Sequence, residues 1–350
     1  MRKAALALYG LIPCLFLQPA NTQLPAQDDP THLRMNVVLV QLSIAVTDSK
    51  GNYVTGLRPE NFEVTEDKIS QRISSFDEGS GSDSTSPDSQ GFDEVQTSAT
   101  SAQTNSQPAH QKIESAAPQE QSAIPGSHVN GASVFVLFDT SNYMYRSFVF
   151  AQDAITDFIR SMNNASRIAF YSYCRDLSRA MQLTSDHFQI VNAVRSTVAG
   201  DDAALYNSLL LTVKDAAPLK GRKAIVVFSN GPDNASSVPP EDVAELAQSS
   251  GTIIYIISTR QAEEDPASAA AFERMSRVSG GKAYFAKNWL DEKKAFASIR
   301  EDLVHLYTLS YYPQANPNRG WRSIKVRLVG KDLQKYHLRT RDGYRLSAQR

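Results

Sequence analysis

The sequence predicts an α/β fold, a doubly wound and mainly parallel sheet that is inserted in a small β-sandwich-like module. Between residues 132 and 303, short continuous apolar runs alternate with amphipathic helical patterns, which is typical of parallel strands covered by helices on both faces. On either side, residues 35–46 and 323–329 alternate apolar and polar side chains with period two, as half-buried strands do. Neither flank alone has enough strands to enclose a core, so we expect both flanks to complete one β module.

This interpretation divides the chain of 350 residues into five segments. Residues 79–130 are rich in serine and glutamine and hold six acidic residues against one lysine, a composition that buries too little apolar surface to fold. The predicted segments are a signal peptide over 1–26, the first part of the β module over 32–77, a disordered linker over 78–131, the α/β domain over 132–303 and the closing strands of the β module over 304–346.

The first residues have the composition of a secretory signal. Arg2 and Lys3 precede an uncharged apolar run of about 14 residues, which is too short to span a bilayer comfortably. We therefore expect cleavage near Ala20 or Ala26 and a secreted or periplasmic bacterial protein, with no transmembrane span in the mature chain. An uncleaved amino-terminal anchor and lipidation at Cys14 are the alternatives.

Charge and cysteine content exclude several classes of function. The chain has 36 Lys+Arg against 37 Asp+Glu, a formal net charge of -1, so no basic field attracts nucleic acid. It holds two cysteines, too few for a disulfide framework, and its six histidines are scattered without zinc-site spacing. We therefore expect neither a nucleic-acid partner nor a His-rich metalloenzyme.

Within the α/β domain, strands and helices alternate along the chain. Ser185 is expected to cap the second helix, and Pro218 ends the third. In a doubly wound sheet, ligands bind at the carboxyl ends of the strands, which directs attention to Asp139 at the end of the first strand. The predicted strands span 133–138, 167–172, 223–229, 252–258 and 283–285, and the predicted helices span 148–162, 186–198, 204–216, 239–248, 272–278 and 292–303.

The flanking strands follow the same reasoning. Phe62, Val64 and Glu66 fall on one side of a strand in the first flank, because successive side chains of a strand point to opposite faces. In the second flank, strands are predicted over 306–311, 323–329 and 338–344. These strands are expected to pair with those of the first flank.

The turn after the first strand of the α/β domain carries Asp139, Ser141 and Tyr143. In this turn the sequence resembles a von Willebrand factor type A domain, a Rossmann-like fold whose metal-ion-dependent adhesion site is built on Asp-x-Ser-x-Ser. The resemblance implies a site completed by a threonine of a later loop and an aspartate after a central strand. Such hard oxygen ligands suit Mg²⁺ and leave a position open for a carboxylate of the partner.

The resemblance is incomplete at three of the five expected ligands. Tyr143 occupies the position of the second serine, Ala203 that of the threonine and Asn230 that of the aspartate. No cofactor is therefore expected, apart from weak Mg²⁺ binding in which Asp139 and Ser141 are the metal ligands. The residues interpreted as partner-binding are Asp139, Ser141, Tyr143, Asp202, Asn230 and Asp233.

Both flanks carry a second resemblance. Residues 46–51, 57–67 and 71–76, with residues 307–312 and 341–344, are similar to the bacterial "VWFA-related" proteins that are expanded in acidobacteria. The resemblance covers nearly all of the mature chain except the linker. It implies an exported protein with an adhesion-type α/β domain.

Three functions remain open. The leading one is a non-enzymatic, exported binding or adhesion module that contacts a protein partner through the carboxyl ends of the strands, with a degenerate adhesion site. The alternative is a genuinely Mg²⁺-dependent adhesin that uses Asp139 and Ser141 together with Asp202 or Asp233. The second alternative is a cryptic hydrolase, although no nucleophile elbow, phosphate-binding loop or acid–base pair accompanies these carboxylates.

Overall fold

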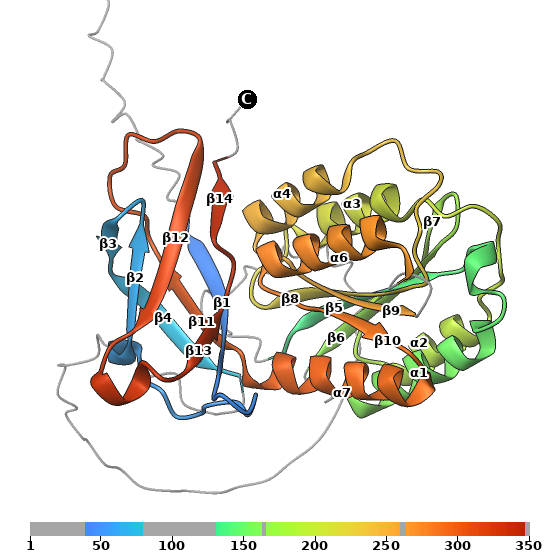
Figure 1. The fold of residues 1–350 in the computed structure, drawn as a ribbon, viewed down its shortest axis with the longest axis horizontal. Coiled ribbons are helices and arrows are strands. Elements are labelled where there is room, and N and C mark those ends of the chain that lie inside the picture. Colours follow the sequence, from blue (N-terminus) through green and yellow to red (C-terminus); the bar gives the residue numbers. More distant parts are fainter. Residues whose placement is uncertain (1–38, 80–130, 163–165, 260–263, 347–350) are drawn as a thin grey trace, which may run out of the picture. The chain divides into compact units, whose positions relative to one another are not determined.

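The computed structural model describes residues 39–79, 131–162, 166–259 and 264–346. The predicted signal peptide and almost all of the predicted linker lie outside these residues, so both stay predictions. The described strands form one six-stranded sheet and two four-stranded sheets (Figure 1).

The six-stranded sheet is the centre of the α/β domain and has the strand order β10-β9-β8-β5-β6-β7. Its neighbours pair in parallel except β7, which runs antiparallel to β6. Strands β5 and β8 are buried at every position, as expected for parallel strands covered on both faces. The strands are β5 (Ser133–Asp139), β6 (Arg167–Tyr173), β7 (Leu177–Thr184), β8 (Lys223–Ser229), β9 (Ile253–Thr259) and β10 (Ala283–Ala286).

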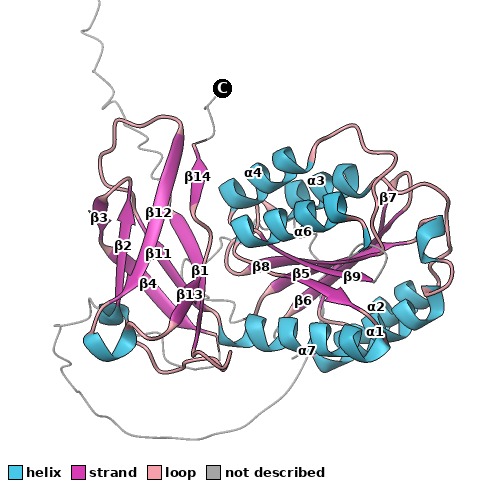
Figure 2. Ribbon diagram, viewed as in Figure 1, coloured by secondary structure: helices cyan, strands magenta, loops and turns pink. Residues whose placement is uncertain are grey.

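Helices cover both faces of this sheet (Figures 1 and 2). One apolar core lies between the sheet and α1, α2 and α7, and a second lies between the opposite face and α3, α4 and α6. The two cores make the domain a helix–sheet–helix sandwich. The helices are α1 (Phe148–Ser161), α2 (His187–Arg195), α3 (Leu205–Ala216), α4 (Pro240–Ser250), α6 (Pro266–Ser279) and α7 (Trp289–His305).

Local capping explains where several helices begin and end. Asp186 accepts hydrogen bonds from the main-chain N–H groups of Phe188 and Gln189 at 3.0 and 3.2 Å. The cap of α2 is therefore Asp186, and the predicted cap Ser185 is wrong by one residue. A side-chain oxygen at the capping position must reach the second or third N–H of the helix, and Asp186 does so. Gly280 ends α6 with a φ of 88°, which a residue with a side chain rarely adopts.

Strand β7 has no counterpart among the predicted strands. None of its eight positions is buried and half of them are exposed, so its sequence shows neither an apolar run nor a clear alternation of period two. Its pairing with β6 shifts register twice, and such bulges move side chains off the regular alternation. The sequence signal for this strand is therefore weak, because it lies at the edge of the sheet.

The two flanks pair with each other in antiparallel sheets. Strand β1 pairs with β11, which also pairs with β4, and β2 pairs with β12. The sheets have the orders β13-β1-β11-β4 and β14-β12-β2-β3 and share an apolar core, so the predicted fold class is confirmed. The limits of the five predicted segments stay predictions. The strands are β1 (Val40–Thr47), β2 (Phe62–Glu66), β3 (Ile69–Gln71), β4 (Ile73–Glu78), β11 (Tyr307–Tyr311), β12 (Trp321–Leu328), β13 (His337–Arg339) and β14 (Gly343–Arg345).

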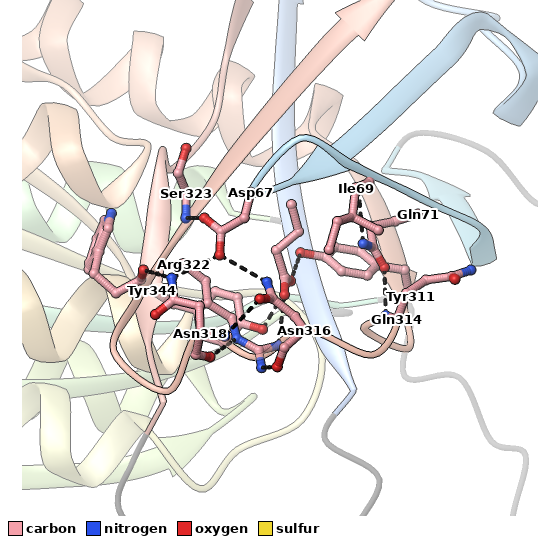
Figure 3. Close-up of polar contacts among 12 residues, drawn as sticks. Asp67, Ile69, Gln71, Tyr311, Gln314, Asn316, Asn318, Arg322, Ser323 and Tyr344 are labelled. Atoms are coloured by element: carbon pink, nitrogen blue, oxygen red, sulfur yellow. Dashed lines mark hydrogen bonds and ion pairs between the residues drawn. The ribbon is translucent and has the colours of Figure 1, made fainter.

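A buried ion pair lies in the core of the β module. Glu66 is fully buried and accepts a hydrogen bond from Nη1 of Arg322 at 2.8 Å. The hydroxyls of Tyr311 and Tyr344 donate to the other carboxylate oxygen at 2.8 and 3.0 Å. Figure 3 shows Arg322, Tyr311 and Tyr344 among these contacts, next to Asp67. The acid that the sequence places on the apolar side of β2 is therefore buried with its own donors, as a buried charge requires.

Polar contacts also join the β module to the α/β domain, and all these residues belong to one compact unit. Asp302 of α7 is 1% exposed and accepts from the hydroxyls of Tyr53 at 2.9 Å and Tyr255 at 2.6 Å. It also pairs with Nη2 of Arg339 at 2.5 Å. Arg341 donates to the carbonyl oxygen of Gln248 near the end of α4, where the helix dipole favours a cation.

Lys223, at the start of β8, is a buried cation with a predictable pH dependence. Burial, and secondly the charge of Arg341, lower the pKa of its ammonium from 10.5 to about 8. The unfolded chain therefore binds more protons than the folded one between pH 8 and 10.5, so the contribution of Lys223 to stability rises with pH in that window.

We expect Lys223→Met to remove this rise, which amounts to at most about 3 kcal/mol. Urea denaturation at a series of pH values measures it as the difference between wild type and variant. Lys214→Met, at an exposed position of α3, is the matched control and should leave the slope unchanged. A constant difference between wild type and Lys223→Met from pH 7 to 10 would contradict the assignment.

Candidate functional site

The predicted site residues gather where β5, β6 and β8 end. Asp139 pairs in register with Tyr173 of β6, and Phe138 pairs with Phe228 of β8. The following loops are joined by main-chain hydrogen bonds, from the Asn142 N–H to the carbonyl oxygen of Asp201 at 2.8 Å among others. We call residues 139–145, 200–206 and 229–236 the carboxyl edge.

Asp139 is the buried acid at the centre of the carboxyl edge. Its side chain is 0% exposed. One carboxylate oxygen accepts from the main-chain N–H of Ser141 at 2.9 Å, and the other accepts from the hydroxyl of Ser229 at 2.7 Å. Burial raises the pKa of the Asp139 carboxyl above its ordinary value, and the hydrogen bonds from Ser141 and Ser229 offset that rise only in part. Burial thus disfavours the charged form of Asp139, and its hydrogen bonds favour it.

Ser141 lies beside Asp139 and is also fully buried. Within the described part of the chain, its hydroxyl oxygen has no hydrogen-bond partner. A buried hydroxyl usually finds a partner, because leaving it unsatisfied costs about 1–3 kcal/mol. The Ser141 hydroxyl nevertheless lies close enough to the Asp139 carboxyl to lower its pKa.

Tyr143 and Asn230 meet across the carboxyl edge. The side-chain amide of Asn230 donates to the main-chain carbonyl oxygen of Tyr143. Asn230 is 4% exposed, whereas Tyr143 is half-buried. The loop after β5 and the loop after β8 are thereby joined by a neutral hydrogen bond.

The two acids expected to substitute for missing ligands are bonded elsewhere. Asp202 pairs with Nη2 of Arg175 at 2.5 Å. Asp233 accepts hydrogen bonds from the N–H groups of Tyr206 and Ser236, both at 2.8 Å. It thereby joins the first turn of α3 to the loop that follows β8. Ala203 is 1% exposed and has no side-chain oxygen to offer.

Comparison with known proteins identifies the domain that holds the carboxyl edge. Residues 133–298 match the model of the von Willebrand factor type A domain. The chain contains a von Willebrand factor type A domain. A search of curated proteins finds no match to the chain.

Several solved structures are similar to this von Willebrand factor type A domain. The conserved hypothetical protein BatB from Bacteroides thetaiotaomicron is 14% identical over 49% of this chain and 98% of its own, with a TM-score of 0.42. The vWF domain of the type V pili tip protein Mfa5 from Porphyromonas gingivalis is 12% identical over 49% of this chain and 94% of its own, with a TM-score of 0.42. Proximal thread matrix protein 1 from the mussel byssus, with a zinc-occupied MIDAS motif, is 12% identical over 53% of this chain and 48% of its own, with a TM-score of 0.42.

The von Willebrand factor type A domain can hold a metal ion at its adhesion site, but the residues present here fit one poorly. Asp139 and the unsatisfied hydroxyl of Ser141 suit a hard cation. The other three positions hold Tyr143, Ala203 and Asn230, and Mg²⁺ affinity depends on the charge and number of oxygen ligands. In the described ranges, no group of three or more His, Cys, Asp or Glu side chains could hold a metal ion.

Two residues of the site escape the sequence analysis. Ser229 donates to Asp139 and in turn accepts from the hydroxyl of Tyr173 at 3.1 Å and from the N–H of Gly231 at 3.0 Å. The two residues are Ser229, which ends the predicted strand 223–229, and Tyr173, which directly follows the predicted strand 167–172. Because the carboxyl ends of parallel strands meet at one edge, their positions were the signal that could have found them.

Proposed function

We propose that the protein is an exported, non-enzymatic binding module that holds a protein partner at the carboxyl edge of its von Willebrand factor type A domain, without tight metal dependence. The observation that carries the proposal is the Asn230–Tyr143 hydrogen bond, which joins the two loops that a metal ion would otherwise bridge. Asp139, Ser141, Tyr143, Asp202, Asn230 and Asp233 are the proposed contact residues.

Export rests on the sequence. Arg2, Lys3 and the apolar run behind them are typical of a secretory signal. Among the described residues, none of the helices has the length and apolar character needed to cross a membrane. An extracytoplasmic location is compatible with adhesion, the function proposed for the module.

One observation favours the metal-dependent alternative. The buried hydroxyl of Ser141 lacks a partner, and a bound cation would provide one. Asp139 and Ser141 alone supply few of the oxygens that Mg²⁺ demands, since its coordination is close to octahedral. A weak site completed by water would follow, rather than a tight one.

We expect a chelator to leave both partner binding and the thermal midpoint of the protein nearly unchanged. Calorimetric titration with Mg²⁺ and with Mn²⁺, beside an Asp139→Ala control, measures the metal affinity directly. Binding to a partner captured from the extracytoplasmic fraction should fall at least about tenfold in Tyr143→Ala, because aromatic side chains at interfaces often carry much of the binding energy.

Phe188→Ala is the matched control for Tyr143→Ala, because Phe188 is 74% exposed and lies on α2, outside the carboxyl edge. Micromolar Mg²⁺ affinity of the wild type, or release of the partner by chelator, would favour the metal-dependent adhesin instead. Equal binding by Tyr143→Ala and Phe188→Ala would remove the carboxyl edge as the contact surface.

A further inference from the structure

The loop between β11 and β12, residues 312–320, has no regular secondary structure but is held by side-chain hydrogen bonds (Figure 3). One carboxylate oxygen of Asp67, in the β2–β3 turn, accepts from the side-chain amides of Asn316 and Asn318, both at 2.9 Å. Arg322 donates to the main-chain carbonyl oxygens of the same two asparagines at 3.3 and 3.1 Å. We call residues 312–320 the tethered loop. A loop that is fixed in this way loses little conformational entropy when it binds.

The turn that holds the tethered loop has a backbone conformation that suits glycine. Asp67 and Lys68 have φ values of 48° and 70°, and a two-residue hairpin turn with both φ values positive favours Asn-Gly or Asp-Gly. Asp67 has a structural role, because its carboxylate bonds the loop. Lys68 is exposed and forms neither an ion pair nor a side-chain hydrogen bond within the described part of the chain. Since a left-handed lysine costs stability, its side chain is the feature that calls for a function.

Three cations surround the tethered loop. Lys68 and Arg72 flank strand β3, whose last residue, Gln71, accepts a hydrogen bond from the main-chain N–H of Gln314 at 2.9 Å. Arg319 lies within the loop itself. All three cations are exposed, and none of them pairs with an acid among the described residues.

The described acids leave this positive charge without compensation. Those on β2, in the β2–β3 turn and beside β14 have partners of their own, namely Glu63 with Arg327, Glu66 with Arg322, Asp67 with the two loop asparagines, Glu245 with Arg345 and Asp342 with Gln248. The other acids of the β module lie at its opposite end, where β2 begins and β1, β4 and β12 end, and are Asp48, Glu60, Asp77, Glu78 and Asp332. Lys325, further along β12, is exposed and adds to the positive charge.

We propose that the tethered loop and its three cations bind an extended, acidic segment of a partner protein. Arginine pairs well with carboxylates, because its planar guanidinium donates two parallel hydrogen bonds. Tyr312, which is 52% exposed, adds an aromatic anchor of the kind that carries binding energy at protein interfaces. The cations belong to separate segments of the β module rather than to one amphipathic helix, so the surface does not have the form that lies on membranes.

The spacing of the cations favours a partner's segment over the acidic residues 79–130 of this chain. Lys68 and Arg72 are four residues apart along an extended strand, which corresponds to about 13 Å. Carboxylates two or four residues apart on one side of an extended segment match that spacing. No two of the six acids within residues 79–130 have it, since they stand at positions 83, 88, 93, 94, 114 and 120.

Fluorescence anisotropy of a labelled peptide, titrated with the full chain, tests the proposal. The peptide alternates glutamate with serine over about ten residues, a length of about 33 Å, and its neutral control has glutamine in place of glutamate. We expect saturable binding of the acidic peptide that weakens between about 0.1 and 1 M salt, because the Debye length falls from about 10 to 3 Å. The surface belongs to the β module, so the result does not depend on what the carboxyl edge binds.

Removal of the three cations should raise the dissociation constant of the acidic peptide at least about tenfold. The variant combines Lys68→Ser, Arg72→Ser and Arg319→Ser. Its matched control removes the same charge from exposed positions of α3, α1 and α6, and should bind within about twofold of the wild type because those charges lie far from the loop. The control combines Lys214→Ser, Arg160→Ser and Arg277→Ser.

Two glycine variants separate a built site from simple charge attraction. Asp67→Gly suits the turn, since glycine accepts a positive φ, but it frees the tethered loop. It should weaken the acidic peptide although it removes a negative charge, whereas charge attraction alone would strengthen binding. Lys68→Gly should raise the thermal midpoint of unfolding and yet lower the affinity, because it relieves the backbone and removes one cation.

Four results overturn the proposal. The first is the absence of saturable binding by the wild type, and the second is equal binding of the glutamate and glutamine peptides. The third is an equal loss in the two triple variants, or tighter binding by Asp67→Gly. The fourth is binding of the full chain to phosphatidylglycerol vesicles without binding to the acidic peptide, which would assign the surface to a membrane.

Discussion

Replacing Asp302 with alanine is expected to lower the free energy of unfolding by about 3–5 kcal/mol, the usual cost of leaving one partner of a buried ion pair without the other. Asp302 is 1% exposed. Its removal leaves the hydroxyls of Tyr53 and Tyr255 without this acceptor. It also leaves the charge of the Arg339 guanidinium unpaired, with the Gly280 carbonyl oxygen as its remaining acceptor. Urea denaturation, followed by circular dichroism, measures the change.

The matched control is Glu245→Ala, which also removes the acidic partner of an arginine. Glu245 pairs with Arg345, but the two side chains are 46% and 52% exposed. A surface pair contributes about 0–1 kcal/mol, so this variant should unfold close to the wild type. If both variants lose the same small free energy, the Asp302 contacts do not stabilise the fold. Asp302→Asn removes the charge but keeps the shape of the side chain, and its loss of unfolding free energy should lie between those of Asp302→Ala and Glu245→Ala.

The α/β domain could be predicted well because its main signals are local. The buried strands β5, β6, β8 and β9 are apolar runs in the sequence, and burial on both faces is what makes such runs. Where the local signal is weak the prediction fails, as at the polar edge strand β7. Local signals also fail in the interior of the β module. Glu66 is an acid on an apolar face, and its partner Arg322 is 256 residues away in the sequence.

The site shows the same limit. The positions of Asp139 and Ser141 follow from the order of the strands and from the resemblance to a known motif. The hydrogen-bond partners do not, because Asp202 and Asp233 lie near the site in sequence and yet bond to Arg175 and to the start of α3. Which oxygen faces which donor depends on loop geometry that periodicity does not encode.

Restoring the three altered positions should convert the carboxyl edge into a measurable Mg²⁺ site. Tyr143→Ser and Ala203→Thr add two hydroxyl ligands, and Asn230→Asp adds a carboxylate next to Ser229, whose hydroxyl already bonds Asp139. We expect the triple variant to be less stable than the wild type in chelator. The carboxylate of Asn230→Asp cannot donate to the Tyr143 carbonyl oxygen as the amide does, and it lies near the Asp139 carboxyl. The threonine of Ala203→Thr enlarges a position that is 1% exposed.

Mg²⁺ should then reverse that loss in the triple variant and leave the wild type nearly unaffected. A ligand that binds only the folded state stabilises it by about 2.7 kcal/mol at a concentration 100 times its dissociation constant, so thermal denaturation with and without Mg²⁺ gives a clear readout beside calorimetry. Adding Asp139→Ala to the triple variant removes the central ligand and should abolish the gain. An equal Mg²⁺ response in the wild type would mean that Asp139, Ser141 and water already complete a site, and that Tyr143, Ala203 and Asn230 do not weaken it.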